Sequence, residues 1–179
     1  GLFSLVRDQS PEELRNNVLA VADTAHMFNL PVVLTTSAEQ GPNGPLMPEL
    51  RQRFPKAGYI PRMGEINAWD NPEVVKAVKK TGRKQLIIAG LVTDVCVAEV
   101  AFSALRAGFQ VFVVTDASGT TSTEVRETTL IRLAMGNVTI INWFAVASQL
   151  MRDWRNDEKG FSAILAEHIP AYKNLIISH

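Results

Sequence analysis

One stretch near the middle of the chain, residues 85–100, constrains the possible folds more than any other. It opens with an unbroken apolar run, Leu86–Ala89, which is typical of a strand buried on both faces of a sheet. Gly90 interrupts this run, and the side chain of Thr93 or Asp94 can accept from the first free N–H groups of a helix. The stretch therefore predicts a strand, a tight turn and a helix.

Cys96, the only cysteine of the chain, falls in the first turn of that predicted helix. Free N–H groups and the positive end of the helix dipole gather there, so a thiolate is favoured. A nucleophile held in this way at the carboxyl edge of a sheet recurs in α/β enzymes. The alternative is a core residue, because cysteine is among the most buried residue types and Cys96 lies between Val95 and Val97.

The same alternation of strands and helices runs through the rest of the chain. Strands are expected at residues 30–36, 59–62, 85–89, 110–115 and 138–141, and helices at residues 11–28, 48–54, 72–80, 93–107, 120–133 and 144–154. This order predicts one α/β domain, residues 1–179, with a doubly wound parallel sheet and helices on both faces. Residues 157–179 form a tail that ends in the apolar Leu175–Ile177, and we expect this tail to contact a neighbouring subunit.

The net charge of the chain is zero, so no basic surface argues for a nucleic-acid or anionic-membrane partner. No apolar run approaches the roughly 18–20 residues of a membrane span, and the N-terminus lacks the regions of a signal peptide. A single cysteine excludes a disulfide framework within the chain and a metal site with several cysteines. We therefore expect a cytoplasmic protein.

Neither a metal nor a cofactor is expected. The three histidines, His26, His168 and His179, are far apart in the sequence and show no ligand spacing. Gly41 and Gly44 lie in a long loop and lack the strand, glycine turn and helix of a phosphate cradle. Because that loop leaves the carboxyl end of a predicted strand, we expect it to shape a pocket instead.

The residues around Cys96, Gly90–Val97, resemble the nucleophile signature of the isochorismatase-like cysteine hydrolases, a superfamily that includes nicotinamidases. Further stretches narrow the resemblance to the YcaC-type branch: LTTSAE (34–39), GPNGP (41–45), INAWD (66–70), VTDASGT (114–120) and RDWRN (152–156). The similarity spans nearly the whole chain, and the joint order of these motifs is far more specific than any one of them.

The resemblance implies a catalytic triad of an aspartate, a basic residue and a cysteine. It gives the nucleophile role to Cys96 and the basic role to Arg62, where many relatives have lysine. An arginine stays charged at any ordinary pH, so Arg62 can stabilise a thiolate or an anion but transfers protons poorly. The alternative is that Arg62 is a surface residue that follows Pro61.

The aspartate of that triad ends the first strand of the family fold, and Gly1 matches the segment just beyond it. Because none of Asp23, Asp70, Asp94 and Asp116 occupies this place, the acid role is assigned to none of them. We expect the strand and its aspartate to precede Gly1 in a longer protein, which an intact mass would reveal. The alternative is a shortened, inactive relative.

The resemblance also implies a non-proline cis peptide bond just before the nucleophile, placed at Val92–Thr93. In that geometry the backbone N–H groups of Thr93 and Cys96 would face a developing oxyanion. Asn67 and Trp69, in the loop after the second predicted strand, are candidates to close the pocket. Trp69 is equally compatible with packing in the core or at a subunit contact.

The predicted function is a cysteine-dependent hydrolase that cleaves a small amide or related substrate through a covalent intermediate on Cys96. The resemblance implies a homo-oligomer, an octamer in particular, and leaves the substrate open. A second possibility is a non-catalytic oligomeric scaffold or small-molecule binder on the same fold. A third is a redox-sensing thiol, although the chain has no second cysteine to resolve a sulfenic acid.

Overall fold

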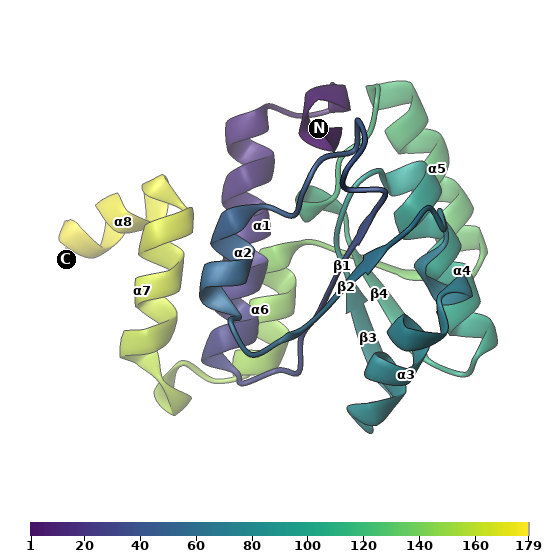
Figure 1. Ribbon diagram of the computed structural model, residues 1–179. Coiled ribbons are helices and arrows are strands. Elements are labelled where there is room, and N and C mark those ends of the chain that lie inside the picture. Colours follow the sequence, from purple (N-terminus) through teal and green to yellow (C-terminus); the bar gives the residue numbers. More distant parts are fainter. Residues whose placement is uncertain (179) are drawn as a thin grey trace.

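Strands and helices alternate along the chain in the computed structural model, which describes residues 1–178 (Figure 1). The strands are β1 (Val33–Ser37), β2 (Gly58–Arg62), β3 (Gln85–Ile88), β4 (Gln110–Val114) and β5 (Thr139–Ile141). The helices are α1 (Pro11–Met27), α2 (Pro48–Arg53), α3 (Pro72–Lys80), α4 (Ala98–Arg106), α5 (Thr123–Met135), α6 (Trp143–Met151), α7 (Glu158–His168) and α8 (Pro170–Ile177). His179 lies outside the described residues.

All paired strands are parallel. β1 pairs with β2, from Val33 opposite Gly58 to Ser37 opposite Arg62, and β4 lies between β3 and β5. β1 and β2 form a two-stranded sheet, and β3, β4 and β5 form a three-stranded one. Arg62 ends β2, and the turn that contains Cys96 follows β3. The predicted α/β fold with parallel strands and flanking helices is confirmed.

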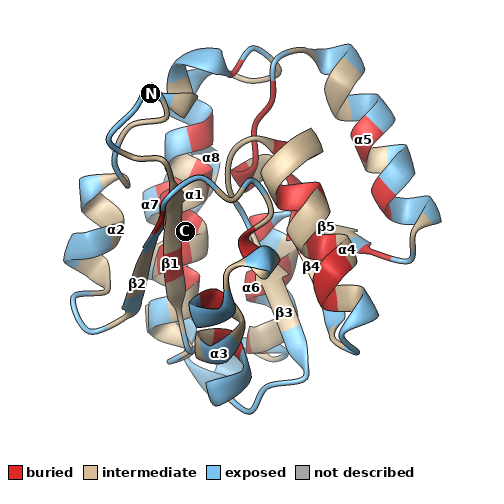
Figure 2. Cartoon of the chain, turned by 45° about the vertical axis from the view of Figure 1, so that its right-hand side comes forward, coloured by how far each residue is buried: buried red, intermediate tan, exposed pale blue. Residues whose placement is uncertain are grey.

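β4 shows why helices cover both faces. Its Val111 and Val113 pack with α4 and α5, whereas its Val114 packs with α6 and α7. Side chains alternate between the two faces of a strand, so a strand with four consecutive apolar residues, as at residues 111–114, must be buried on both faces. Figure 2 shows the buried residues gathered where the helices face the strands.

Several predicted boundaries differ from the structure by three residues or more, among them the end of the last predicted helix, which lies at Met151 rather than at residue 154. The first strand begins at Val33 rather than at Leu30, because the Leu30 N–H closes a turn on the Ala25 carbonyl (2.8 Å). The helix expected from residue 120 begins at Thr123, where the Ser122 hydroxyl accepts from the Val125 N–H (3.2 Å). Between β4 and α5, residues 115–117 form a short 3-10 helix and residues 118–122 form a loop.

The tail is mostly helical, and α7 packs against α1. The His168 ring, buried between these helices, contacts Asn16 through Nδ1 (3.0 Å) and Asp23 through Nε2 (2.8 Å). In α8, Leu175, Ile176 and Ile177 are exposed. Within residues 1–178, no helix is long and apolar enough to cross a membrane.

Candidate active site

The turn that contains Cys96 is wider than the first turn of an α-helix. Residues 93–97 form a π-helical turn that runs directly into α4. The Val97 N–H donates to Val92 O (3.2 Å), five residues back, where an α-helix would bond four residues back. Cys96 is partly exposed, whereas Val97 beside it is buried in the core. This exposure favours a reactive thiol over a core residue.

Two predictions about this turn are wrong. Neither Thr93 nor Asp94 caps the helix with its side chain, because the Asp94 carboxylate instead accepts from the Thr120 hydroxyl (2.5 Å). The non-proline cis peptide bond joins Leu91 and Val92, one residue before the predicted position.

The backbone N–H of Thr93 also differs from its expected role. It donates to the Gly119 carbonyl (3.0 Å), so this geometry does not support Thr93 as an oxyanion donor. The Thr93 hydroxyl is buried and has no hydrogen-bond partner within residues 1–178. A buried hydroxyl without a partner is costly, which makes this side chain a candidate for a functional role.

Arg62 is buried, with 6% of its surface exposed, and is therefore not the surface residue of the alternative interpretation. Its Nε donates to the Thr35 hydroxyl (3.0 Å), and its Nη1 donates to the Glu65 and Ile66 carbonyls. Burial lowers the pKa of the Arg62 guanidinium, and negative charge on Cys96 and Glu65 partly opposes this shift. The fold thus brings Arg62 and Cys96, 34 positions apart in the sequence, within electrostatic reach of each other.

The loops beside Arg62 are bonded to one another. The Ser37 hydroxyl donates to the Glu65 carbonyl (3.0 Å), and the Asn43 amide donates to the Ser37 carbonyl (2.8 Å). The loop after β1 and the loop after β2 are therefore joined at the edge where Arg62 lies. A pocket shaped by the glycine- and proline-rich loop stays a prediction.

Asn67 and Trp69 are held by neighbours other than Cys96 and Arg62. The Asn67 side chain donates to the Ser103 hydroxyl (2.9 Å) and accepts from the Trp69 N–H (3.0 Å). The Trp69 ring meets Phe109 edge to face, with centroids 5.6 Å apart. These contacts fit the packing interpretation of Trp69, and a pocket role for the two residues stays a prediction.

Three of the aspartates considered for the acid role are engaged elsewhere. Asp94 bonds to Thr120, Asp23 bonds to Arg53 and His168, and Asp116 accepts from the Trp143 N–H (3.0 Å). Burial raises the pKa of Asp116, and the Trp143 bond partly opposes this effect. The acid role therefore remains unassigned.

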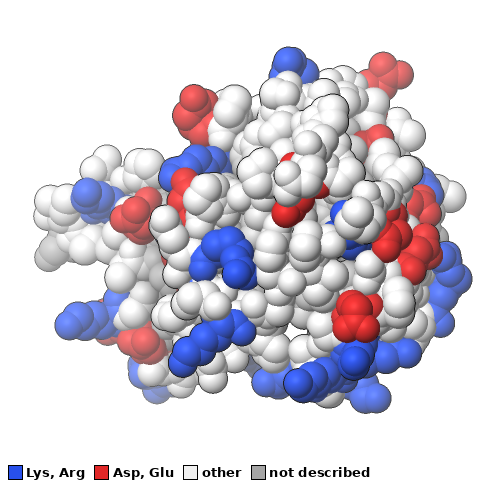
Figure 3. Space-filling model, in the orientation of Figure 1, with Lys and Arg blue, Asp and Glu red and all other residues white. Residues whose placement is uncertain are grey.

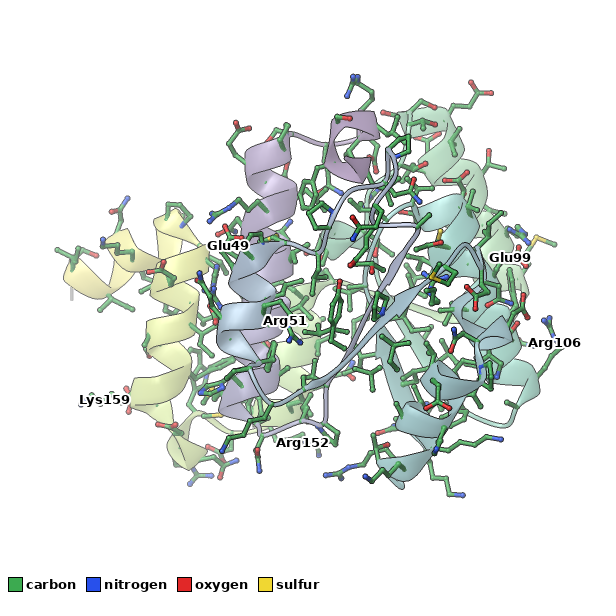
Figure 4. All side chains as sticks on the ribbon, viewed as in Figure 1. Glu49, Arg51, Glu99, Arg106, Arg152 and Lys159 are labelled. Atoms are coloured by element: carbon green, nitrogen blue, oxygen red, sulfur yellow. The ribbon has the colours of Figure 1, made fainter. Side chains whose placement is uncertain are left out.

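Charged side chains lie mostly on the outer surfaces. Glu99 and Arg106 project from the outer side of α4 (Figure 4), so this helix turns its apolar face toward the strands. Lys and Arg gather at the edge where α3 lies (Figure 3), as its lysine-rich sequence predicts. Among residues 1–178, no group of three or more His, Cys, Asp or Glu is arranged to hold a metal ion.

The loop after β4 is a part of the site that sequence reasoning missed. Residues 118–120 bond to the turn that precedes Cys96, and residues 7–9 bond to this loop in turn. The motif at residues 114–120 includes this loop but by itself indicates no contact with the turn before Cys96. Asp8 gave no signal at all, since it is one charged residue in a short N-terminal segment.

Comparison with known proteins decides the family. Residues 6–143 match the isochorismatase domain. The chain belongs to the isochorismatase family. It is 57% identical to the probable hydrolase YcaC of Escherichia coli (strain K12) over 179 residues, which cover 100% of this chain and 86% of that protein.

Solved structures of YcaC proteins agree with this family assignment. YcaC from Pseudomonas aeruginosa, solved with hexane-2,5-diol and covalent acrylamide, superposes with a TM-score of 0.98 at 63% identity over 99% of this chain and 88% of that one. E. coli YcaC, described as an octameric hydrolase of unknown specificity, gives a TM-score of 0.97 at 58% identity over 99% and 87%. The chain is thus an isochorismatase-like member of a hydrolase family.

Proposed function

We propose that this protein is a cysteine-dependent hydrolase of a small amide or related substrate. The observation that supports this most is the partly exposed Cys96 within electrostatic reach of the buried Arg62. A cation held beside the sulfur favours the thiolate, which is the nucleophilic form. Because Arg62 is held by three oxygen acceptors, its charge has a fixed position.

In the proposed reaction the Cys96 sulfur attacks the substrate carbonyl carbon and the C–N bond breaks. The nitrogen leaves with a proton as an amine or ammonia, and the acyl group remains on sulfur as a thioester. Water then attacks the thioester, releases a carboxylic acid and restores the thiol. Arg62 stabilises negative charge in both halves of the reaction.

Relatives support parts of this proposal. The P. aeruginosa YcaC structure contains covalent acrylamide, a small amide that alkylates thiolates. E. coli YcaC is described as an octamer, and we propose a homo-octamer here too, with the exposed apolar residues of α8 at a subunit contact. The substrate class rests on the family alone, because neither YcaC protein is described with a substrate.

The competing proposal is a binder or scaffold on the same fold. What favours it is the engagement of Asp23, Asp94 and Asp116 with other partners, which leaves none of these three carboxylates free to act as the acid. What opposes it is the buried Arg62 charge beside a partly exposed thiol. A buried charge is costly, and a protein that only binds neutral ligands gains nothing from it.

The test has two steps. Native protein is treated with iodoacetamide, and labelling at Cys96 is followed by intact mass, with Cys96→Ala as the blank and Arg62→Met as the charge-removed variant. We expect fast native labelling that slows at least about tenfold in Arg62→Met, because a tenfold effect needs only about 1.4 kcal/mol of thiolate stabilisation. Release of ammonia from a panel of small primary amides is then compared between wild type and Cys96→Ser. Labelling only after unfolding would refute the hydrolase and favour the binder.

A further inference from the structure

The turn before Cys96 is bonded to a loop outside its own helix, residues 118–120 after β4. Three hydrogen bonds join the two segments: Gly90 N–H to Ser118 Oγ (3.2 Å), Thr93 N–H to Gly119 O (3.0 Å) and Thr120 Oγ1 to Asp94 Oδ1 (2.5 Å). The last two reach residues within one turn of the sulfur. The position of Cys96 therefore depends on where this loop lies.

The loop is bonded on its other side to the N-terminal segment. The Asp8 carboxylate accepts from the Thr120 N–H (2.8 Å) and from Arg126 Nη1 of α5 (3.0 Å). The Arg7 N–H donates to the Thr120 carbonyl (2.9 Å). Thr120 is thus bonded through its N–H, its carbonyl and its hydroxyl at once, and it is fully buried.

Asp8 is the charged member of this arrangement, and its side chain is 0% exposed. A carboxylate removed from water is tolerated only when charge-assisted bonds replace its hydration. One Asp8 oxygen accepts from Arg126, and the other accepts from Thr120, so the ion pair and the loop are held by the same group. A neutral amide at this position offers one acceptor oxygen for two donors.

We propose that Asp8 is a positioning residue for Cys96. It holds Thr120, Thr120 holds Asp94 through its hydroxyl, and Asp94 sets the turn that aims the sulfur toward Arg62. Asp8 touches neither the sulfur nor a substrate in this arrangement. This inference rests on the proposed cysteine chemistry, and it assigns a role to a side chain more than 80 positions away from the nucleophile in the sequence.

The test measures the rate of native iodoacetamide labelling at Cys96 together with the unfolding midpoint. Asp8→Asn is expected to label at least about tenfold more slowly, because a displacement of about 1 Å costs up to roughly 100-fold in such sites. The matched control is Asp23→Asn, which makes the same chemical change in a carboxylate paired with Arg53 and His168 at the α1–α7 contact. We expect Asp23→Asn to lower the unfolding midpoint but to leave the labelling rate within about twofold of wild type.

Thr120→Val supplies a second variant, since it removes the hydroxyl and keeps the backbone bond to Asp8. If Asp8 acts through Thr120, the double variant Asp8→Asn/Thr120→Val labels no more slowly than the slower of the two single variants. In each single variant, adding Arg62→Met then lowers the labelling rate by a smaller factor than it does in wild type. A variant that only destabilises the fold leaves unchanged the factor by which Arg62→Met slows labelling.

The outcomes separate the two proposals. If wild-type Cys96 is unreactive, the hydrolase proposal fails and the positioning role fails with it. If wild type reacts in an Arg62-dependent way while Asp8→Asn behaves like Asp23→Asn, only the positioning role is overturned. Should Asp8→Asn not fold, Thr120→Val decides, and an unchanged rate in that variant refutes the chain of contacts.

Discussion

Arg62 Nε donates to the hydroxyl of Thr35 at 3.0 Å, across the β1–β2 pair. The same hydroxyl donates to the Ile60 carbonyl (2.7 Å), so its proton is committed and its lone pair faces the guanidinium. One threonine on the neighbouring strand thereby fixes the direction of the buried cation. The Arg62 charge is thus held by the neighbouring strand on one side and by the Glu65 and Ile66 carbonyls of the loop after β2 on the other.

Thr35→Val keeps the branched shape but removes the acceptor. We expect a loss of about 1–3 kcal/mol in the free energy of unfolding, because a buried charged donor loses a partner. Iodoacetamide labelling of Cys96 is expected to slow several-fold as the guanidinium loses its fixed direction. The control is Thr36→Val on the opposite face of β1, where the hydroxyl bonds to Glu39 instead. Equal labelling of both variants would contradict the role given to Thr35.

Thr93→Val removes a buried hydroxyl that has no partner within residues 1–178, and Thr24→Val in α1 does the same far from Cys96. In both variants the free energy of unfolding is expected to stay unchanged or to rise by up to about 1 kcal/mol, because an unsatisfied polar group is lost. Only Thr93→Val is expected to slow acrylamide addition at Cys96, because it removes a hydroxyl that can bond to an amide in the site in the wild type. Denaturant titration measures the stability and intact mass measures acrylamide addition. Slower acrylamide addition in Thr24→Val would contradict a specific role for the Thr93 hydroxyl.

Gly119→Ala tests how closely the loop after β4 is packed. A Cβ at Gly119 would lie 2.9 Å from both methyl carbons of Val6 and 3.2 Å from Leu14 Cδ2, and both side chains are buried. We expect a loss of about 1–3 kcal/mol, because an overpacked core must shift. Gly58→Ala is the control, since a Cβ there meets no atom within 4 Å. Urea unfolding of the two variants checks this, and similar midpoints would show that the loop has room to move.

Asp23 is expected to make the stability of the protein depend on pH. Burial raises its pKa, but the bonds from His168 and Arg53 more than offset this and lower the pKa to about 2 from the ordinary value of 3.8. A carboxylate with a lowered folded-state pKa adds stability above its unfolded-state pKa and loses it as the pH falls through the folded-state pKa. We expect a contribution on the order of 2 kcal/mol that disappears between about pH 4 and pH 2.

Asp23→Asn is expected to lower stability at pH 7 and to flatten the stability profile in that acidic range. Urea titrations of wild type and variant at several pH values measure this. A variant profile as steep as that of wild type would mean that other carboxylates are responsible for the acid sensitivity.

The apolar end of α8 gives a prediction about assembly. Ile177 is 74% exposed in the isolated chain, and we propose that a neighbouring subunit covers it. Ile177→Glu is expected to shift the proposed octamer toward smaller species in light scattering, because the charge would be buried at the contact. Ile131→Glu on α5 alters another exposed isoleucine and is expected to leave the assembly intact. The opposite pattern would place the contact on α5.

The sequence predicted what depends on local pattern and missed what depends on distant contacts. The apolar run before Gly90 predicted a strand, and Asn71 followed by Pro72 predicted the capped start of α3, because each signal lies within a few residues of its effect. The resemblance pointed to Arg62 and Cys96. The cap predicted at Asp94 failed because Thr120, 26 residues further on, takes its carboxylate.

The burial of Asp8 is a second feature that the local sequence does not predict. Nothing in the sequence of residues 1–10 distinguishes an exposed carboxylate from one buried beside Thr120 and Arg126. Its burial follows from the meeting of that segment with a loop and a helix more than 100 residues away in the sequence. Only the three-dimensional arrangement reveals it.

The wide turn at residues 93–97 sets the position of the Cys96 sulfur, and α4 after it packs against the sheet. In a regular helix one set of residues would serve both purposes. The buried side of α4 keeps its own spacing, with Ala98, Ala101 and Ala104 against the sheet, whatever the turn before it does. A π-helical turn contains one residue more than an α-helical one, so inserting or deleting a residue there re-aims the sulfur without rotating the rest of the helix. Evolution, or a protein engineer, can therefore adjust the reach of the nucleophile while the core of the domain stays as it is.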